Sequence, residues 1–247
     1  RRRAVTRGGF TLVELVVALA LGGIVTASLL GVLSGTRRLA QVHAIRVEWA
    51  EALRTAESVL VGELRFLDPR ADIYEVGADS LALRAFRGSG VVCRVVNGSI
   101  LVRYQGVRAP EPAKDSLLVV DAPGRERALP LEASDRMEGG CALRDGESLY
   151  RLHAGEIVAV GALVLVFESA SYHLAASALR YRRGLSGRQP LTAEIVDDGA
   201  STFTLYPDEP AFEATLVLEP MGGSGSGNTA RIRVGLLNGA PAEEGGP

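Results

Sequence analysis

The sequence lacks a strong excess of charge of either sign. It has 27 lysines and arginines against 29 aspartates and glutamates, for a formal net charge of −2. Such a chain has no broad attraction for phosphate backbones, so nucleic-acid binding would require a local basic patch. The apolar share of 47% in 247 residues is nevertheless enough for a real core. We therefore expect one or two folded domains and no nucleic-acid partner.

The sequence also has little of what a metal site or an active site needs. The three histidines, His43, His153 and His173, have no ligand spacing, which argues against zinc. No Gly-x-Ser-x-Gly elbow occurs, and the Gly/Ser-rich segment 222–227 lacks the lysine of a phosphate-binding loop. The Asp-Asp-Gly sequence at 197–199 is typical of a turn and falls short of the six to eight oxygens that calcium takes. We expect no metal, no cofactor and no enzymatic activity.

One long apolar segment is present close to the N-terminus. From Phe10 to Leu33 its only formal charge is Glu14. As a helix it would be roughly 36 Å long at about 1.5 Å per residue, enough to cross a hydrocarbon core of about 30 Å. Residues 1–9 are rich in arginine, and Arg37 and Arg38 end the segment. The N-terminal charge predicts a cytoplasmic N-terminus and an exported remainder.

Glu14 is the feature that a simple membrane anchor does not explain. A secretory signal peptide would have a shorter apolar core followed by small residues at its cleavage site. A carboxylate inside an apolar helix is costly and is by default functional, with a partner. If the chain is cut after Gly9, the new amino group of Phe10 lies one helical turn from Glu14. In an assembly, the amino terminus of a neighbouring subunit is a second partner.

The basic leader, Gly9 and the sequence Phe-Thr-Leu-Val-Glu at 10–14 resemble the N-terminus of type IV pilins and type II secretion pseudopilins. The resemblance implies cleavage between Gly9 and Phe10 by a prepilin peptidase. It further implies N-methylation of Phe10 and pairing of Glu14 with an N-terminus during filament assembly. Gly31 stands where many pilins have a helix-bending proline, and glycine can loosen the helix there at modest cost.

Helical spacing continues beyond the apolar segment to about Phe66. Asp68-Pro69 is expected to end the helix, and Trp49 is expected to anchor the core. The apolar stripe consists of Val42, Ile45, Trp49, Leu53, Ala56, Leu60 and Leu64. The charged residues expected largely on the other faces are Arg46, Glu48, Glu51, Arg54, Glu57 and Glu63.

From Ile73 onward the period of the apolar residues changes to two, which predicts strands. Asn97-Gly98 predicts a type I′ turn between strands 91–96 and 99–104. In that register three pairs share one buried face, namely Val95 with Ile100, Cys93 with Val102, and Val91 with Tyr104. Other strands are expected at 80–86, 115–121, 148–152, 157–160, 163–167, 172–174, 178–182, 212–218 and 230–237, and no clear element at 122–146.

These patterns predict an α+β fold, pilin-like, in which one long N-terminal helix packs on an antiparallel β-sheet. The expected organisation is a leader at 1–9, a transmembrane and filament-core helix at 10–35, the periplasmic half of the helix at 36–67, a β-rich globular periplasmic domain at 68–238 and a disordered tail at 239–247. Two cysteines in an exported domain leave two alternatives open, a disulfide between Cys93 and Cys141 or two free core thiols.

The second half is similar to the PilW/PulJ group of minor pilins, which includes pseudopilin J. The similar segments are 115–120, 172–191 and 203–206. The resemblance implies a structural subunit of the bacterial inner membrane that joins a pilus or pseudopilus and primes or caps it. The partners implied are other pilins, the prepilin peptidase and an inner-membrane assembly platform. The sequence does not separate a type IV pilus from a secretion pseudopilus or a DNA-uptake pilus.

Two other functions remain as alternatives. A pilus-tip adhesin or a DNA-uptake binding subunit would present an exposed aromatic or basic patch. The one basic cluster consists of Arg180, Arg182, Arg183 and Arg188, and it is also typical of a solvated strand end. An anchored periplasmic enzyme would need a pocket with convergent polar groups, which the sequence does not indicate.

Overall fold

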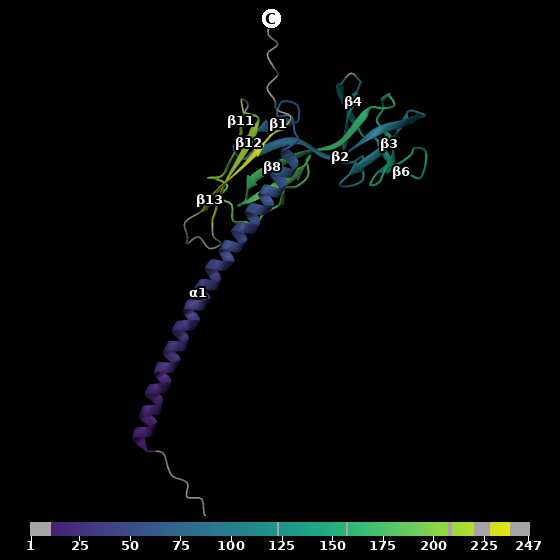
Figure 1. Cartoon of the computed structure of the whole chain (residues 1–247). Coiled ribbons are helices and arrows are strands. Elements are labelled where there is room, and N and C mark those ends of the chain that lie inside the picture. Colours follow the sequence, from purple (N-terminus) through teal and green to yellow (C-terminus); the bar gives the residue numbers. More distant parts are fainter. Residues whose placement is uncertain (1–10, 123, 157, 207–208, 220–227, 238–247) are drawn as a thin grey trace, which may run out of the picture. The chain divides into compact units, whose positions relative to one another are not determined.

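The computed structural model describes residues 11–122, 124–156, 158–206, 209–219 and 228–237. It divides into two compact units, Arg1–Glu48 and Trp49–Pro247, which we call the anchor unit and the globular unit. Helix α1, Leu12–Leu64, contributes to both (Figure 1). The strands all follow α1 and pair in antiparallel fashion, so the fold is α+β, as predicted. The predicted leader junction at Gly9 and Phe10, the segment 222–227 and the tail 239–247 lie outside the described residues.

The anchor unit contains an apolar helix whose large side chains are exposed. The leucines, valines and isoleucine from Leu12 to Leu33 are all at least half accessible. The helix is long and apolar enough to cross a membrane. Its few hydroxyls bond to the preceding turn: Thr26 Oγ1 donates to the Gly22 carbonyl at 2.8 Å, and Ser28 Oγ to the Ile24 carbonyl at 2.9 Å. These polar groups are therefore satisfied within the helix, as an apolar environment requires.

In the globular unit, the last turns of α1 form one wall of a core. The buried residues of this face are Ala52, Ala56, Leu60 and Leu64, with Trp49 and Leu53 partly buried beside them. The predicted stripe is thus correct in phase from Trp49 onward, whereas Val42 is exposed and Ala52, which the prediction left out, is buried. The prediction is wrong for Glu63, which was expected on an outer face. Its side chain is 19% exposed and pairs with Arg87 of the sheet.

The main sheet contains ten strands among the described residues, in the order β10-β9-β8-β2-β3-β7-β6, with β1 on β2, β4 on β8 and β5 on β4. A separate sheet has the order β11-β12-β13. The bounds are β1 Ile73–Val76, β2 Ser80–Val96, β3 Ser99–Gly106, β4 Ser116–Asp121, β5 Arg125–Pro130, β6 Ala133–Met137, β7 Ser148–His153, β8 Leu163–Ala175, β9 Ala178–Arg183, β10 Gln189–Pro190, β11 Thr202–Tyr206, β12 Ala211–Leu218 and β13 Asn228–Gly235.

Strands β2 and β8 pair with each other (Figure 1), and both contribute residues to each of the two hydrophobic cores found among the described residues. The first core joins α1, the start of β2, the end of β8 and the smaller sheet, and includes Leu60, Tyr172 and Phe212. The second joins the end of β2 to β3, β4 and β7, and includes Val102 and Leu117. The pairing of β2 with β8 shifts between Phe86 and Gly88, at the passage from one core to the other.

The hairpin β2–β3 has the predicted turn but only part of the predicted register. Asn97 and Gly98 have positive φ values of 47° and 77°, as a type I′ turn requires, and Val95 pairs with Ile100. A bulge between Val92 and Arg94 then shifts the pairing by one residue, because β2 carries an extra residue there. The predicted pairs Cys93 with Val102 and Val91 with Tyr104 are wrong. Val92 pairs with Val102, and Gly90 with Tyr104.

Other differences from prediction concern strands at the edges and the length of β8. Strands β5 and β6 lie within 122–146, where no element was expected; most of their residues are exposed, so they lack the apolar alternation on which the prediction relied. Strand β8 is continuous where two strands, 163–167 and 172–174, were predicted. The strand predicted at 157–160 is absent from the described residues 158–160.

Candidate functional site

The first candidate site is the beginning of α1. The Glu14 carboxylate accepts hydrogen bonds from the backbone N–H of Thr11 at 3.0 Å and from the Thr11 hydroxyl at 2.9 Å. In return, the Glu14 N–H donates to Thr11 Oγ1 at 3.3 Å. This reciprocal arrangement is a capping box, with Thr11 at the N-cap and Glu14 three residues later. The Thr-x-x-Glu spacing indicates it in the sequence, and our sequence analysis missed it.

The capping box gives Glu14 a partner inside its own chain. All three hydrogen bonds involve Oε2 of the carboxylate or the Thr11 hydroxyl, and Oε1 forms no hydrogen bond within the described residues. The end of the helix is exposed. The carboxylate thus caps the start of the helix with one oxygen, while its other oxygen remains available to a cation outside this chain.

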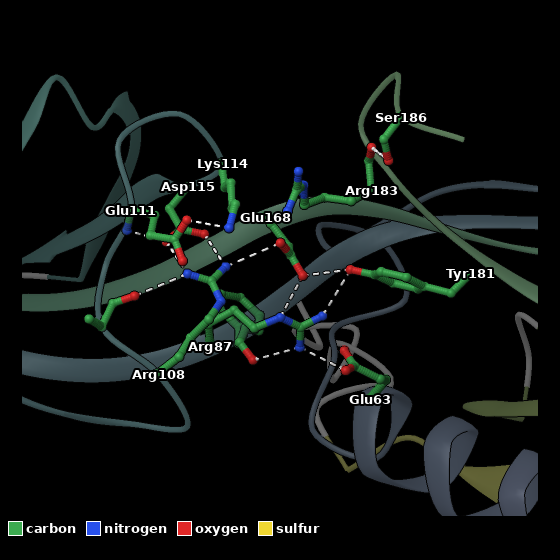
Figure 2. Close-up of polar contacts among 12 residues, drawn as sticks. Glu63, Arg87, Arg108, Glu111, Lys114, Asp115, Glu168, Tyr181, Arg183 and Ser186 are labelled. Atoms are coloured by element: carbon green, nitrogen blue, oxygen red, sulfur yellow. Dashed lines mark hydrogen bonds and ion pairs between the residues drawn. The ribbon is translucent and has the colours of Figure 1, made fainter. Parts of the chain in front are cut away.

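The second candidate site is a buried ion-pair network in the globular unit (Figure 2). At its centre is Arg87, which lies at the irregularity of β2. Its Nε donates to Glu168 Oε1 at 2.7 Å, and its Nη1 to Glu63 Oε1 at 2.7 Å. The Tyr181 hydroxyl donates to Glu168 Oε1 at 2.5 Å. One guanidinium therefore joins the end of α1 to β2, β8 and β9.

Arg108 extends this network toward the loop 107–115. Its two terminal nitrogens donate to the two oxygens of Asp115, each at 2.6 Å, and Nη2 also donates to Glu168 Oε2 at 3.1 Å. The Tyr104 hydroxyl lies 3.1 Å and 3.0 Å from the carbonyl oxygens of Arg87 and Arg108, so it links the two backbones. The bidentate pair is the stronger geometry for an arginine and a carboxylate.

The pKa shifts of the network show how burial and hydrogen bonding compete at each group. Burial raises the pKa of Glu63, although Arg87 opposes the shift. Burial also works against the charge of Glu168, but hydrogen bonds from Tyr181 and Arg87 outweigh it and lower its pKa. Burial and the bond to Glu168 raise the pKa of Tyr181 to about 12. Because these groups are bonded to one another, we interpret the network as a structural connection between the two cores.

The cysteines are joined in a disulfide, with the Cα atoms of Cys93 and Cys141 6.3 Å apart. Cys93 is the extra residue of the β2 bulge, so the bond ties that bulge to the segment between β6 and β7. The bulge explains how Cys93 leaves the predicted register, which would have directed it to the buried face opposite Val102.

The other sequence candidates do not come together. His173 lies 2.9 Å from the Ser171 hydroxyl, and His153 lies 3.3 Å from Glu132. No group of three potential metal ligands occurs in the described residues. Asp197 Oδ1 accepts hydrogen bonds from the N–H groups of residues 199 and 200, each at 3.0 Å, which accounts for the Asp-Asp-Gly sequence as a turn.

The basic cluster predicted near β9 is divided between two faces of the strand. Arg180 bonds to Glu194 and Arg182 to the Ser186 carbonyl, at 3.2 Å and 3.0 Å. Arg183 lies on the same face as Tyr181, because side chains alternate along a strand, and both line one hollow. The guanidinium of Arg183 forms no hydrogen bond or ion pair among the residues that the structure describes.

Comparison with protein families finds a match at the N-terminus. A family model described as the prokaryotic N-terminal methylation motif matches residues 6–30. No curated protein and no solved structure matches the chain significantly. The matched region contains Gly9, Phe10, the capping box and the first part of the apolar helix. The match supports a type IV pilin-like protein, anchored by a single N-terminal helix, that a prepilin peptidase processes and that assembles with other pilins.

Proposed function

We propose that the chain is a minor pilin or pseudopilin, a non-enzymatic structural subunit of the PilW/PulJ type that primes or caps a filament. The observation that carries the proposal is the methylation motif placed directly on a capped, membrane-length helix. The proposed maturation is cleavage between Gly9 and Phe10 on the cytoplasmic side, followed by methylation of the Phe10 amine. The subunit then has its globular domain in the periplasm until it leaves the membrane.

In this proposal, Glu14 sets the register of the helix in the filament. Its Oε1 is the oxygen that the capping box leaves without a hydrogen bond in the described chain. In the apolar surroundings of packed helices an unpaired carboxylate is costly, so positions that bring a neighbour's amino terminus to Glu14 are favoured. Before assembly, the capping box holds the Glu14 carboxylate at the end of the helix, where that amino terminus can reach it.

The test compares two substitutions of Glu14 for incorporation into filaments sheared from cells. Glu14→Gln retains the capping-box hydrogen bonds, since glutamine serves at that position, but removes the charge. Glu14→Ala removes both. We expect both variants to remain in the membrane and to be missing from filaments. Glu57→Ala, which removes an exposed glutamate of the same helix, should assemble normally.

The two Glu14 variants separate the proposed ionic role from helix capping. If Glu14→Gln assembles as well as the unchanged protein while Glu14→Ala does not, capping alone accounts for Glu14 and its proposed register role is wrong. If both variants assemble, Glu14 has no part in assembly.

A further inference from the structure

The turn between β9 and β10 holds an apolar side chain in water. Leu185 is 94% exposed. The turn around it is closed by its own hydrogen bonds: the N–H and the hydroxyl of Ser186 donate to the Arg183 carbonyl at 2.9 Å and 2.6 Å. Arg182 Nε donates to the Ser186 carbonyl at 3.0 Å. The leucine is therefore presented by an ordered turn, although its side chain contributes little to the core.

A basic hollow lies directly beside this turn. It has a volume of about 320 Å³, and the residues that line it are Arg108, Lys114, Glu168, Tyr181, Arg183, Ser186, Gly187 and Gln189. A second hollow shares Lys114, Arg183 and Ser186 with the first and reaches Leu185. Figure 2 shows the Arg183 side chain extending from β9 toward the segment that carries Lys114. We call the two hollows together the Arg183 pocket.

The hydrogen bonds of the Arg183 pocket leave the donors of one guanidinium for an external anion. Glu168 is the only carboxylate in the lining of the first hollow, and both of its oxygens are already bonded, Oε1 to Arg87 and Tyr181 and Oε2 to Arg108. Lys114 pairs with Glu111 at the surface, and the charge of Arg183 also acts on Glu111 through space, without a hydrogen bond between them. Arg183 keeps its guanidinium donors unused among the described residues. A carboxylate that enters the pocket meets these donors without displacing an internal ion pair.

We propose that the Arg183 pocket binds the carboxylate of an acidic segment of a partner protein, while Leu185 contacts an apolar side chain next to it. A nucleic-acid backbone fits less well, because Arg182 and Arg183 lie on opposite faces of β9 and offer no continuous row of cations. A lipid surface also fits less well, because Leu185 is the only large apolar side chain of the turn. The inference does not depend on filament assembly and holds for any partner of this chemistry.

The test uses the full-length protein in detergent micelles and two blocked dipeptides, N-acetyl-leucyl-glutamate amide and N-acetyl-leucyl-glutamine amide. Saturation-transfer NMR detects the weak binding expected of such small probes. We expect the glutamate peptide to bind about tenfold more tightly than the glutamine peptide, the gain typical of a charge-assisted hydrogen bond. Arg183→Gln should remove this preference. Arg136→Gln, which changes an exposed arginine of β6, should leave it unchanged.

Two results would overturn the proposal. One is equal binding of the two peptides by the unchanged protein, and the other is a preference for glutamate that survives Arg183→Gln. Inorganic phosphate is added as a competitor. If phosphate binds more tightly than the glutamate peptide, the pocket is a phosphate site and the proposal is also overturned. The melting temperature of Arg183→Gln should stay close to that of the unchanged protein, because in the described part of the chain this guanidinium has no hydrogen bond to lose and acts on Glu111 only through space.

Discussion

Removal of the Arg87 guanidinium should cost much of the stability of the globular unit. In Arg87→Met, the Glu63 carboxylate loses the only cation bonded to it in the described structure, and Glu168 keeps Arg108 and Tyr181. The side chains of Arg87, Glu63 and Glu168 are only 13%, 19% and 7% exposed. Breaking a buried pair by removing one partner typically costs about 3–5 kcal/mol. At about 2–4 °C per kcal/mol for a domain of this size, the melting temperature should fall by roughly 6–20 °C.

The assay is urea unfolding of the full-length protein in detergent, followed by the fluorescence of Trp49. Trp49 is the only tryptophan and packs against the first core, so it reports on the globular unit. The control is Arg127→Met, which breaks the ion pairs of a 37% exposed arginine with Asp121 and Glu156 and should cost about 0–1 kcal/mol per pair. Adding Glu63→Gln to Arg87→Met should recover part of the loss. If Arg87→Met lowers the free energy of unfolding no more than the control does, the network does not stabilise the globular unit.

Three further predictions concern the same unit. The pKa of Glu168 is lowered, so the stability that its charge contributes is present above the ordinary pKa of 4.5 and is lost as the pH falls below it. In Glu168→Gln, the free energy of unfolding should therefore depend less on pH in that acid range, as measured by urea titrations at several pH values. Cys141→Ser opens a bond that joins residues 48 apart and should cost about 4 kcal/mol on the chain-entropy account; thiol labelling that succeeds only after reduction checks the bond itself. A Cβ on Gly90 would lie 2.5 Å from the Arg103 carbonyl oxygen, so Gly90→Ala should lower the free energy of unfolding by about 1–3 kcal/mol. Gly235 has open space around it, so Gly235→Ala should have the melting temperature of the unchanged protein.

The helix and its start were within reach of sequence reasoning because their signals are local. The apolar run, the spacing that places Leu60 and Leu64 on one face and the Thr11-x-x-Glu14 capping box each depend on neighbours within a few positions. The Asn97-Gly98 turn is local in the same sense, and it was predicted correctly. The methylation motif belongs to this class as well, which is why the N-terminal end of the chain carries the most specific functional information.

The capping box was missed although its signal is local, whereas most of the other missed features depend on contacts between distant segments. Arg87 and Glu168 are 81 positions apart, so no spacing rule predicts that they meet or that Glu63 turns toward them. The bulge at Cys93 shifts the hairpin pairing by one residue. It accompanies a long-range contact, because Cys93 is bonded to Cys141. Edge strands β5 and β6 bury few side chains, and their sequences therefore lack the alternation that marks a strand.

N-terminal mass spectrometry of the protein from native membranes and from sheared filaments decides whether this chain matures as a pilin. We expect a mature chain that begins at Phe10 with a methylated amine, present in both fractions. A prepilin-peptidase inhibitor or deletion strain serves as the control and should retain residues 1–9. A native protein that keeps its leader in cells with an active peptidase, and that is absent from filaments, would instead be a membrane-anchored domain with a different function.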